Sequence, residues 1–251
     1  MTAPAEPLPP AERTVGQLVG ESMRLYGRRF LRAAITVGVP VALLDLLAAQ
    51  FERPAAYAVA VLGGAVLVTA SYVAACLVAL EPPRDRGRLA LAYAVGAVLF
   101  VPFPFLASVF VLPGLAWFAL VGLSVPVILV EGAGVRAALR RSVHLARADF
   151  VHAVGGLAAL AIVYFLARFG LAVLLRGQGD QTEAIAAFLS DTVVSPVLFL
   201  GAALLYVDQA ARVVDSAAPT TTRARRTRNR ADLHPADDPH GPGRADAQVE
   251  P

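Results

Sequence analysis

Lysine is absent from this sequence, and all 22 of its basic Lys or Arg positions are arginine. The absence excludes a phosphate-loop lysine, a Schiff-base lysine and a lysine general base. The only cysteine is Cys76, which excludes an internal disulfide and a metal site built from several thiolates. Charge is also scarce, because only 16% of the 251 residues are Asp, Glu, Lys or Arg. Soluble domains carry about 25%, so the composition argues against a soluble fold.

Apolar residues take the place of the missing charge. They make up 57% of the chain, and the mean hydropathy is +0.62. Residues 89–130 contain no charged side chain, whereas one helix needs about 20 apolar residues to cross a bilayer. This stretch therefore predicts two spans joined by a turn, either at Pro102 with Pro104 or at Pro113 with Gly114. The first choice leaves the leading span too short, so we expect the turn at the second pair.

Four further apolar stretches complete the prediction of an all-α integral membrane protein with six transmembrane helices. The predicted spans are about residues 30–50, 57–80, 89–110, 114–130, 151–175 and 192–212. We bound this membrane domain at residues 14–214. Composition predicts disorder in the proline-rich lead of residues 1–13 and in the arginine-containing tail of residues 215–251.

The arginines predict the orientation of these spans. Excess positive charge in short loops marks the cytoplasmic side, and six spans leave both termini on one side. With both termini inside, 19 arginines fall in inner segments, two fall in outer loops and Arg168 falls within a span. We therefore expect a multi-pass protein of the cell (plasma) membrane with cytoplasmic N- and C-termini.

Two amphipathic helices are predicted on the inner face, over residues 14–30 and 135–150. At the start of the first, Thr14 and Gln17 fit a capping box, in which the two side chains satisfy free backbone donors. Both helices place apolar residues at helical spacing opposite a polar face, which is typical of helices lying on a membrane. The expected apolar faces are Val15, Leu18, Val19, Met23, Tyr26 and Phe30, and Val135, Leu139, Val143, Ala146 and Phe150.

The second amphipathic helix also offers candidate contacts for anionic lipid headgroups. These candidates are Arg136, Arg140, Arg141 and Arg147. A basic residue near an anionic leaflet contributes about 1 kcal/mol. Plain topological anchoring by the same arginines is the alternative. The expected partner is thus the lipid bilayer. The tail also contains a basic run, RARRTRNR, whose arginines are suited to phosphate. Because the last span tethers this run near the inner leaflet, we expect it to bind the membrane and do not expect it to bind nucleic acid.

A family resemblance rests on the residues around this helix. A span carrying Pro126 and ending at Glu131 leads into a helix with Ala138, Leu139, Arg140, Arg141, Ser142 and Leu145, and Tyr206 with Asp208 closes the last span. These motifs resemble the membrane domain of the glycerophosphoryl diester phosphodiesterase family and its stand-alone relatives, over roughly residues 14–214. The resemblance implies six helices and a role at the membrane. It does not imply phosphodiesterase activity, because the family's hydrolase is a separate soluble domain and only the short tail follows the last predicted span.

The sequence offers no recognisable catalytic constellation. His144 and His152 stand eight positions apart without the carboxylate pattern of a metal site, and the other two histidines lie in the tail. No G-x-S-x-G element is present, and Cys76 in an apolar span reads as a packing residue. We therefore expect a protein that is not an enzyme and has no cofactor or metal.

Charged residues inside the predicted spans are the strongest candidates for more than packing, because unpaired ionisable groups in a bilayer cost several kcal/mol. Asp45 and Arg168 lie at similar depth near the outer ends of their spans, at about 1.5 Å of rise per residue. We predict that they form an ion pair. Arg32 and Asp208 lie at comparable depth on the inner side and are predicted to pair likewise. Glu131 is expected to join that inner pair or to accept backbone donors; snorkelling of both arginines is the alternative.

Three functions follow from these observations. The favoured hypothesis is a non-enzymatic membrane scaffold or lipid-interacting module, which rests on the two amphipathic helices. The alternative is a small transporter or a permease-like subunit of a transport complex, which rests on the charges within the spans and on helix breaks such as Pro102 with Pro104. A membrane-embedded lipid-modifying enzyme is least favoured, because no set of acid, base and nucleophile is apparent.

Overall fold

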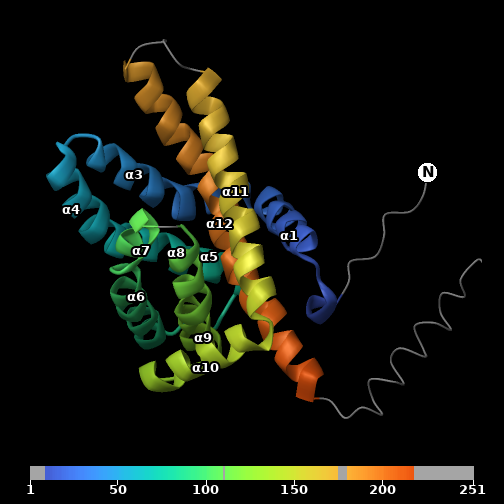
Figure 1. Cartoon of the computed structure of the whole chain (residues 1–251). Coiled ribbons are helices and arrows are strands. Elements are labelled where there is room, and N and C mark those ends of the chain that lie inside the picture. Colours follow the sequence, from blue (N-terminus) through green and yellow to red (C-terminus); the bar gives the residue numbers. More distant parts are fainter. Residues whose placement is uncertain (1–8, 110, 175–179, 218–251) are drawn as a thin grey trace, which may run out of the picture. The chain divides into compact units, whose positions relative to one another are not determined.

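The computed structural model describes residues 9–109, 111–174 and 180–217, and these residues form helices with no strand (Figure 1). The chain divides into two compact units, Met1–Val213 and Val214–Pro251, and the fold below is that of the first. The helical elements are η1 Pro10–Glu12, α1 Val15–Arg28, α2 Phe30–Ala33, η2 Ala34–Gly38, α3 Val39–Ala48, α4 Arg53–Gly63, η3 Gly64–Val68, α5 Thr69–Leu80, α6 Arg86–Phe100, α7 Phe103–Val109, α8 Val111–Trp117, η4 Phe118–Gly122, α9 Ser124–Glu131, α10 Val135–Ala148, α11 Phe150–Leu174 and α12 Asp180–Ala217.

Six helical stretches of the described residues are long and apolar enough to cross a membrane. They are Phe30–Ala48, Ala55–Leu80, Arg86–Leu106, Val111–Glu131, Phe150–Leu174 and Ala184–Ser216. Their lengths range from 19 to 33 residues, and a bilayer requires about 20. The expectation of an all-α chain with six helices of membrane-crossing length is thereby confirmed.

The helix break between the third and fourth stretches differs from the expected turn. α8 begins at Val111, so Pro113 and Gly114 lie inside a helix and not in a turn. Proline is tolerated in the first turn of a helix, where its missing N–H has no helical partner to bond. The chain also breaks at Val101 and Pro102, inside the third stretch, so the prolines of the rejected alternative interrupt a helix but do not end the span. The third and fourth stretches are joined between α7 and α8, and these two short helices pack against each other.

Three of the six stretches contain a π-helical turn. These turns are η2, η3 and η4. A π-turn widens the helix locally and shifts the faces of the residues on either side, and such turns recur at functional sites. In the first stretch η2 brings Gly38 against α12, where a Cβ on this glycine would lie only 2.0 Å from the carbonyl oxygen of Thr192. A side chain of any size at position 38 would push α12 away.

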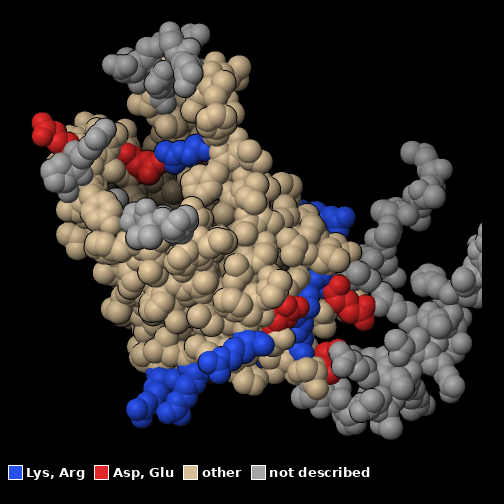
Figure 2. Space-filling view, in the orientation of Figure 1, with Lys and Arg blue, Asp and Glu red and all other residues tan. Residues whose placement is uncertain are grey.

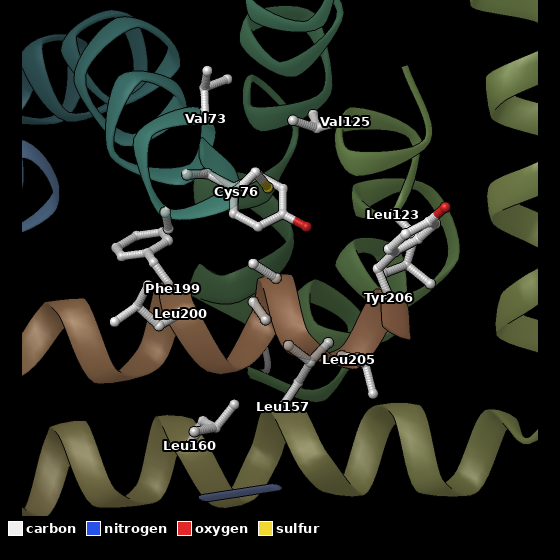
Figure 3. Packing of buried hydrophobic residues seen from close by; sticks show 14 of the residues in the cluster. Val73, Cys76, Leu123, Val125, Leu157, Leu160, Phe199, Leu200, Leu205 and Tyr206 are labelled. Carbon is white, nitrogen blue, oxygen red and sulfur yellow. The ribbon is translucent and has the colours of Figure 1, made fainter. Parts of the chain in front are cut away.

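The core of the first unit is built around α12. Figure 3 shows α12 between α11 on one side and the helices of the chain's middle third on the other, with Leu157 and Leu160 of α11 directed toward it. Leu200 and Leu205 of α12 are almost fully buried. Tyr72 of α5 is also fully buried and forms edge-on ring contacts with Phe100 and Phe118. The last apolar stretch is thus the most enclosed of the helices, with 67% of its apolar window buried.

Helices are present at both positions where an amphipathic helix was expected, α1 and α10. The capping box of Thr14 and Gln17 is formed at the start of α1. The buried residues of α1 are Leu18, Ser22, Leu25 and Tyr26, and those of α10 are Ala138, Ser142, Leu145 and Ala146. Of the expected apolar faces, Met23, Phe30, Val135 and Phe150 are exposed. Small and hydroxyl residues therefore form the contact of α10, because they allow close approach to η4 and α9.

α1 packs on the side of α11 in this fold. A Cβ on Gly156 of α11 would lie 3.0 Å from Leu18, and one on Gly155 would lie 3.9 Å from Val15. Small residues of α11 thus allow α1 to pack closely against it. Burial raises the pKa of the Tyr26 phenol, also on α1, above its ordinary value.

Candidate functional site

Three helices bring a cluster of charged and phenolic side chains together, which we call the Arg168 cluster: Asp45 of α3, Tyr164 and Arg168 of α11, and Asp191 of α12. Arg168 Nη2 forms an ion pair with Asp45 Oδ2. Arg168 Nη1 donates to Asp191 Oδ1 at 2.7 Å and to the Tyr164 hydroxyl at 2.9 Å. Tyr164 in turn donates to Asp191 Oδ1 at 2.7 Å. The pairing of Asp45 with Arg168 is the one expected from their similar depth.

The members of the Arg168 cluster differ sharply in exposure. The side chains of Asp45 and Arg168 are 37% and 35% exposed, whereas that of Asp191 is fully buried. Figure 2 shows acidic and basic atoms meeting beside a hollow near the upper end of the view. With both carboxylates ionised, two negative charges share one guanidinium, so the cluster carries one unit of excess negative charge.

Polar atoms without hydrogen-bond partners surround Asp191 on α12. Asp191 Oδ2 and the hydroxyls of Ser190, Thr192 and Ser195 are all buried, and none has a partner among the described residues. Pro196 follows inside the helix and has no N–H to donate to the Thr192 carbonyl. Unsatisfied polar groups are costly in an apolar surrounding and are rare in native proteins. This part of α12 is therefore the least satisfied polar region of the described core.

A second polar network joins the beginning of α1 and α11 to the end of α12. Arg13 Nη1 binds the buried Asp208 at 2.7 Å, and Arg212 Nη1 binds Asp149 at 2.8 Å. Arg212 also donates to the backbone carbonyl of Arg13 at 2.9 Å. The predicted pair of Arg32 with Asp208 is wrong. Arg32 is exposed on α2, and Asp208 is bound from the segment before α1, which depth along a span could not reveal.

Glu131 forms a third polar contact at the junction of α9, α10 and α12. Its Oε1 accepts a hydrogen bond from the Tyr206 hydroxyl at 3.0 Å and lies 3.4 Å from Arg141 Nε. It thus accepts from side chains, and it joins neither Arg32 nor Asp208. Ser142 Oγ donates to the Leu120 carbonyl at 2.6 Å. Pro126 is buried within α9.

The candidate headgroup arginines of α10 divide into two groups. Arg136, Arg140 and Arg147 are exposed, and Figure 2 shows basic atoms gathered along the lower edge of the view, where α10 lies in Figure 1. Arg141 is one third exposed and bound to Glu131. Arg141 therefore serves the junction with α9 and is no longer a free headgroup contact.

The polar contacts show which helix ends share a side of the first unit. Arg29, before α2, donates to the Val78 carbonyl near the end of α5 at 2.5 Å and pairs with Glu81. A Cβ on Gly132, after α9, would lie 2.6 Å from the guanidinium carbon of Arg88 near the start of α6. These contacts and the network of Asp149 with Arg212 lie at the end where α10 is found. We call it the α10 end.

The Arg168 cluster lies at the other end of the same helices. Arg168 is 18 residues beyond the start of α11, and Asp191 is 17 residues before Asp208 on α12. At about 1.5 Å per residue, either interval corresponds to more than 25 Å of helix. The two polar regions are therefore separated by most of the thickness of a hydrocarbon core, about 30 Å.

The described residues offer no conventional metal or thiol chemistry. No group of three or more His, Cys, Asp or Glu residues that could hold a metal ion occurs among them. Cys76 is fully buried among the apolar side chains of the core (Figure 3). The chemistry that the arrangement can perform is ion pairing, proton exchange and the binding of small charged groups.

Sequence reasoning missed Asp191 and Tyr164. The last span was predicted to begin at residue 192, which placed Asp191 just outside it, whereas the apolar helix begins at Ala184. Tyr164 lies one helical turn before Arg168, on the same face, and that spacing was a usable signal. A search for polar partners one turn from each charge in a span would have found it.

No family model, curated protein or solved structure matches the chain. The class of protein is defined by the helices themselves. Six apolar helices of membrane-crossing length and an almost entirely helical fold fit a polytopic α-helical membrane protein.

Proposed function

We propose that the chain is a non-enzymatic membrane module that binds anionic lipid headgroups through α10. The observation that carries this proposal is the exposed face of α10, where Arg136, Arg140 and Arg147 stand opposite the buried Ala138 and Ser142. Arginine is suited to phosphate because its planar fork donates two parallel hydrogen bonds. Helix packing holds these arginines in place at the α10 end, so headgroup binding there orders no flexible segment.

The orientation of the module follows from the same residues. The segments expected to be cytoplasmic include α10 and the start of α1, and both meet at the α10 end, where Arg13, Arg29 and Arg212 also lie. We propose that this end faces the cytoplasm and that α1 and α10 lie at the inner leaflet of the plasma membrane. The anionic lipids of that leaflet attract basic residues at its surface.

The test compares lipid retention by the purified full chain and by a variant with Arg136→Gln, Arg140→Gln and Arg147→Gln. Both are placed in nanodiscs of equal parts phosphatidylglycerol and phosphatidylcholine, and co-purified lipid is counted by native mass spectrometry. At about 1 kcal/mol for each arginine, we expect the preference for phosphatidylglycerol to fall at least about tenfold.

The matched control removes two arginines from another exposed surface, with Arg24→Gln and Arg28→Gln on α1. These side chains are 66% and 69% exposed and already lie near Glu21. Their loss is expected to change the lipid preference much less. An equal loss in control and test variants would show a general charge effect and would contradict a headgroup site on α10.

We also propose membership of the family that the sequence resembles, the membrane domain of glycerophosphoryl diester phosphodiesterases. Support comes from the contacts of the motif residues. Glu131 and Tyr206 form a hydrogen bond between α9 and α12, and Ser142 ties α10 to η4 through the Leu120 carbonyl. Residues that fix a bend between a span and a surface helix are expected to recur in a family that shares this fold. A solved structure of a family member with the same junction would test the assignment.

A second candidate function is that of a small transporter or a permease-like subunit. The Arg168 cluster favours it, because buried charges and a proline-interrupted helix are features of transport sites. The test is osmotic swelling of vesicles that contain the full chain, with small solutes of each charge class supplied in turn. Swelling above that of empty vesicles supports transport, and a response equal to empty vesicles for every solute argues against it.

A further inference from the structure

The Arg168 cluster holds two carboxyl groups and one guanidinium, which leaves one acid more than base. Asp191 is the most deeply buried of its members. Asp45 and Asp191 share the single guanidinium of Arg168, and Tyr164 is neutral. An isolated buried charge is expensive unless it is paired or neutralised. We propose that Asp191 binds a proton within the membrane and that this carboxyl group is a proton-exchange site of the protein.

Exposure decides which of the two carboxyl groups takes the proton. Asp45 is 37% exposed and contacts Arg168 Nη2, so it keeps both a counter-ion and access to water. Asp191 is fully buried, and its Oδ1 already accepts from Arg168 and Tyr164. Its Oδ2 is also buried and has no partner among the described residues. Oδ2 is therefore the free oxygen on which a proton neutralises the surplus charge, and no other bond has to break.

The same side of α12 offers acceptors for the hydrogen of a protonated Asp191. Ser195 lies one helical turn later, and its hydroxyl is buried without a partner among the described residues. The carbonyl of Thr192 lacks its helical donor because Pro196 has no N–H. Residues 191, 192 and 195 lie within about 100° of one another around the helix axis. Ser195, one turn away on the same side, is therefore a candidate acceptor for this proton.

The charged and titratable groups that face Asp191 are all members of the cluster. They are Asp45 from α3 and Tyr164 and Arg168 from α11, and Gly38 of η2 contributes only backbone at Thr192. Arg168 stays protonated throughout, as arginine does in proteins. The proton arrives from water at the exposed Asp45 side and leaves by the same route unless the helices rearrange. The inference goes beyond lipid binding, and it concerns binding of the proton whether or not any solute is transported.

The experiment uses infrared difference spectroscopy of the purified full chain in lipid vesicles, with protons as the only varied ligand. Spectra are recorded at a series of pH values in choline chloride. We expect a carbonyl band of a protonated carboxylic acid at neutral pH that disappears as the pH is raised. Asp191→Asn, which keeps the shape of the side chain, is expected to abolish this band. Asp45→Asn leaves one carboxylate for the one guanidinium, so it is expected to keep the band only at lower pH than the wild type.

Circular dichroism and the elution volume of each variant establish that it is folded. If Asp191→Asn does not fold, Ser195→Ala gives an independent readout. It removes a hydrogen-bond acceptor for protonated Asp191, so we expect the frequency of the same band to shift. A band that persists in Asp191→Asn, or the absence of any band near neutral pH in the wild type, overturns the proposal. Loss of the band on replacing choline by sodium at constant pH also overturns it, because the occupant would then be a metal cation. None of these outcomes depends on the lipid preference or on vesicle swelling.

Discussion

At the scale of single residues, Arg168 is the basic partner of two carboxylates, and we expect its replacement to be more damaging than that of either acid. At alkaline pH, where Asp191 has lost its proton and the measurement is made, Arg168→Gln leaves Asp45 and Asp191 facing each other's negative charge without a cation between them. Removing one partner of a fully buried pair costs about 3–5 kcal/mol. Because Arg168 is 35% exposed, solvent screens part of this effect, and we expect a loss of roughly 1–3 kcal/mol.

The loss is measured as the fall in melting temperature of the full chain in detergent. The double variant Arg168→Gln with Asp191→Asn removes the surplus charge together with the arginine, so it is expected to recover part of the stability. Arg24→Gln, at a side chain that is 66% exposed, is the control and is expected to have no measurable effect. A double variant that melts below Arg168→Gln would contradict the electrostatic explanation, since it would show that Asp191 stabilises without its charge partner.

Residue-level prediction from the sequence succeeded where depth in the membrane determines the partner. Asp45 and Arg168 were expected to pair because each lies a few residues from the same end of its helix, and α3 and α11 bring them together. Depth alone failed for Asp208, because its partner, Arg13, comes from a segment outside the spans. Hydropathy does not report on such segments, so their contacts with buried charges have to be seen in the fold.

At the scale of helices, the sequence predicted the number and type of the long elements but not their packed faces. Charge-free runs are enough to locate spans, because each has to exceed about 20 residues. Within a span almost every residue is apolar, so periodicity does not show which face meets a neighbour. The stripe of α10 expected to lie on the membrane includes Val135 and Phe150, which are exposed, and the contact with neighbouring helices is made by Ala138 and Ser142, which the apolar pattern does not mark. Close approach between helices in lipid selects small residues over large ones.

The attachment of α10 gives a prediction at this scale. Ser142 donates to the Leu120 carbonyl at 2.6 Å and is fully buried between α10 and η4. Ser142→Ala removes this hydrogen bond, which contributes about 1 kcal/mol. Local opening of α10 is then expected to become roughly fivefold more frequent. Hydrogen–deuterium exchange of the α10 amides, followed by mass spectrometry, measures this opening.

The control is Ser124→Ala. Ser124 Oγ of α9 donates to the Val121 carbonyl of η4 at 2.7 Å, three residues earlier in the same membrane-crossing stretch, so it does not bind α10. It is expected to leave the exchange of α10 unchanged, even though the same kind of hydrogen bond is lost. Equal acceleration in the two variants would mean that α10 responds to global stability and not to its own junction.

At the scale of the whole membrane unit, the contacts place the helix ends in two groups, and this grouping predicts which segments reach which side of the membrane. The α10 end holds Arg29, Arg88 and Arg212, and the Arg168 cluster lies at the opposite end. Spans that alternate in direction produce this division, and the positive-inside rule predicts that the arginine-rich end faces the cytoplasm. The assignment extends to both surface helices, since α1 and α10 are attached to the same set of helix ends.

Site-directed labelling tests this assignment directly. The native Cys76 is fully buried, so the protein carries no thiol of its own that a bulky reagent reaches among the described residues. Gln50→Cys lies just after α3, near the Arg168 cluster, and Ala137→Cys lies on the exposed face of α10. In intact cells a membrane-impermeant maleimide is expected to label Gln50→Cys and to leave Ala137→Cys unreacted until the membrane is permeabilised. The reverse pattern would show the opposite topology, and the inner leaflet would then not be the partner of the α10 arginines. Labelling of both sites in intact cells would show that the two positions lie on the same side of the membrane.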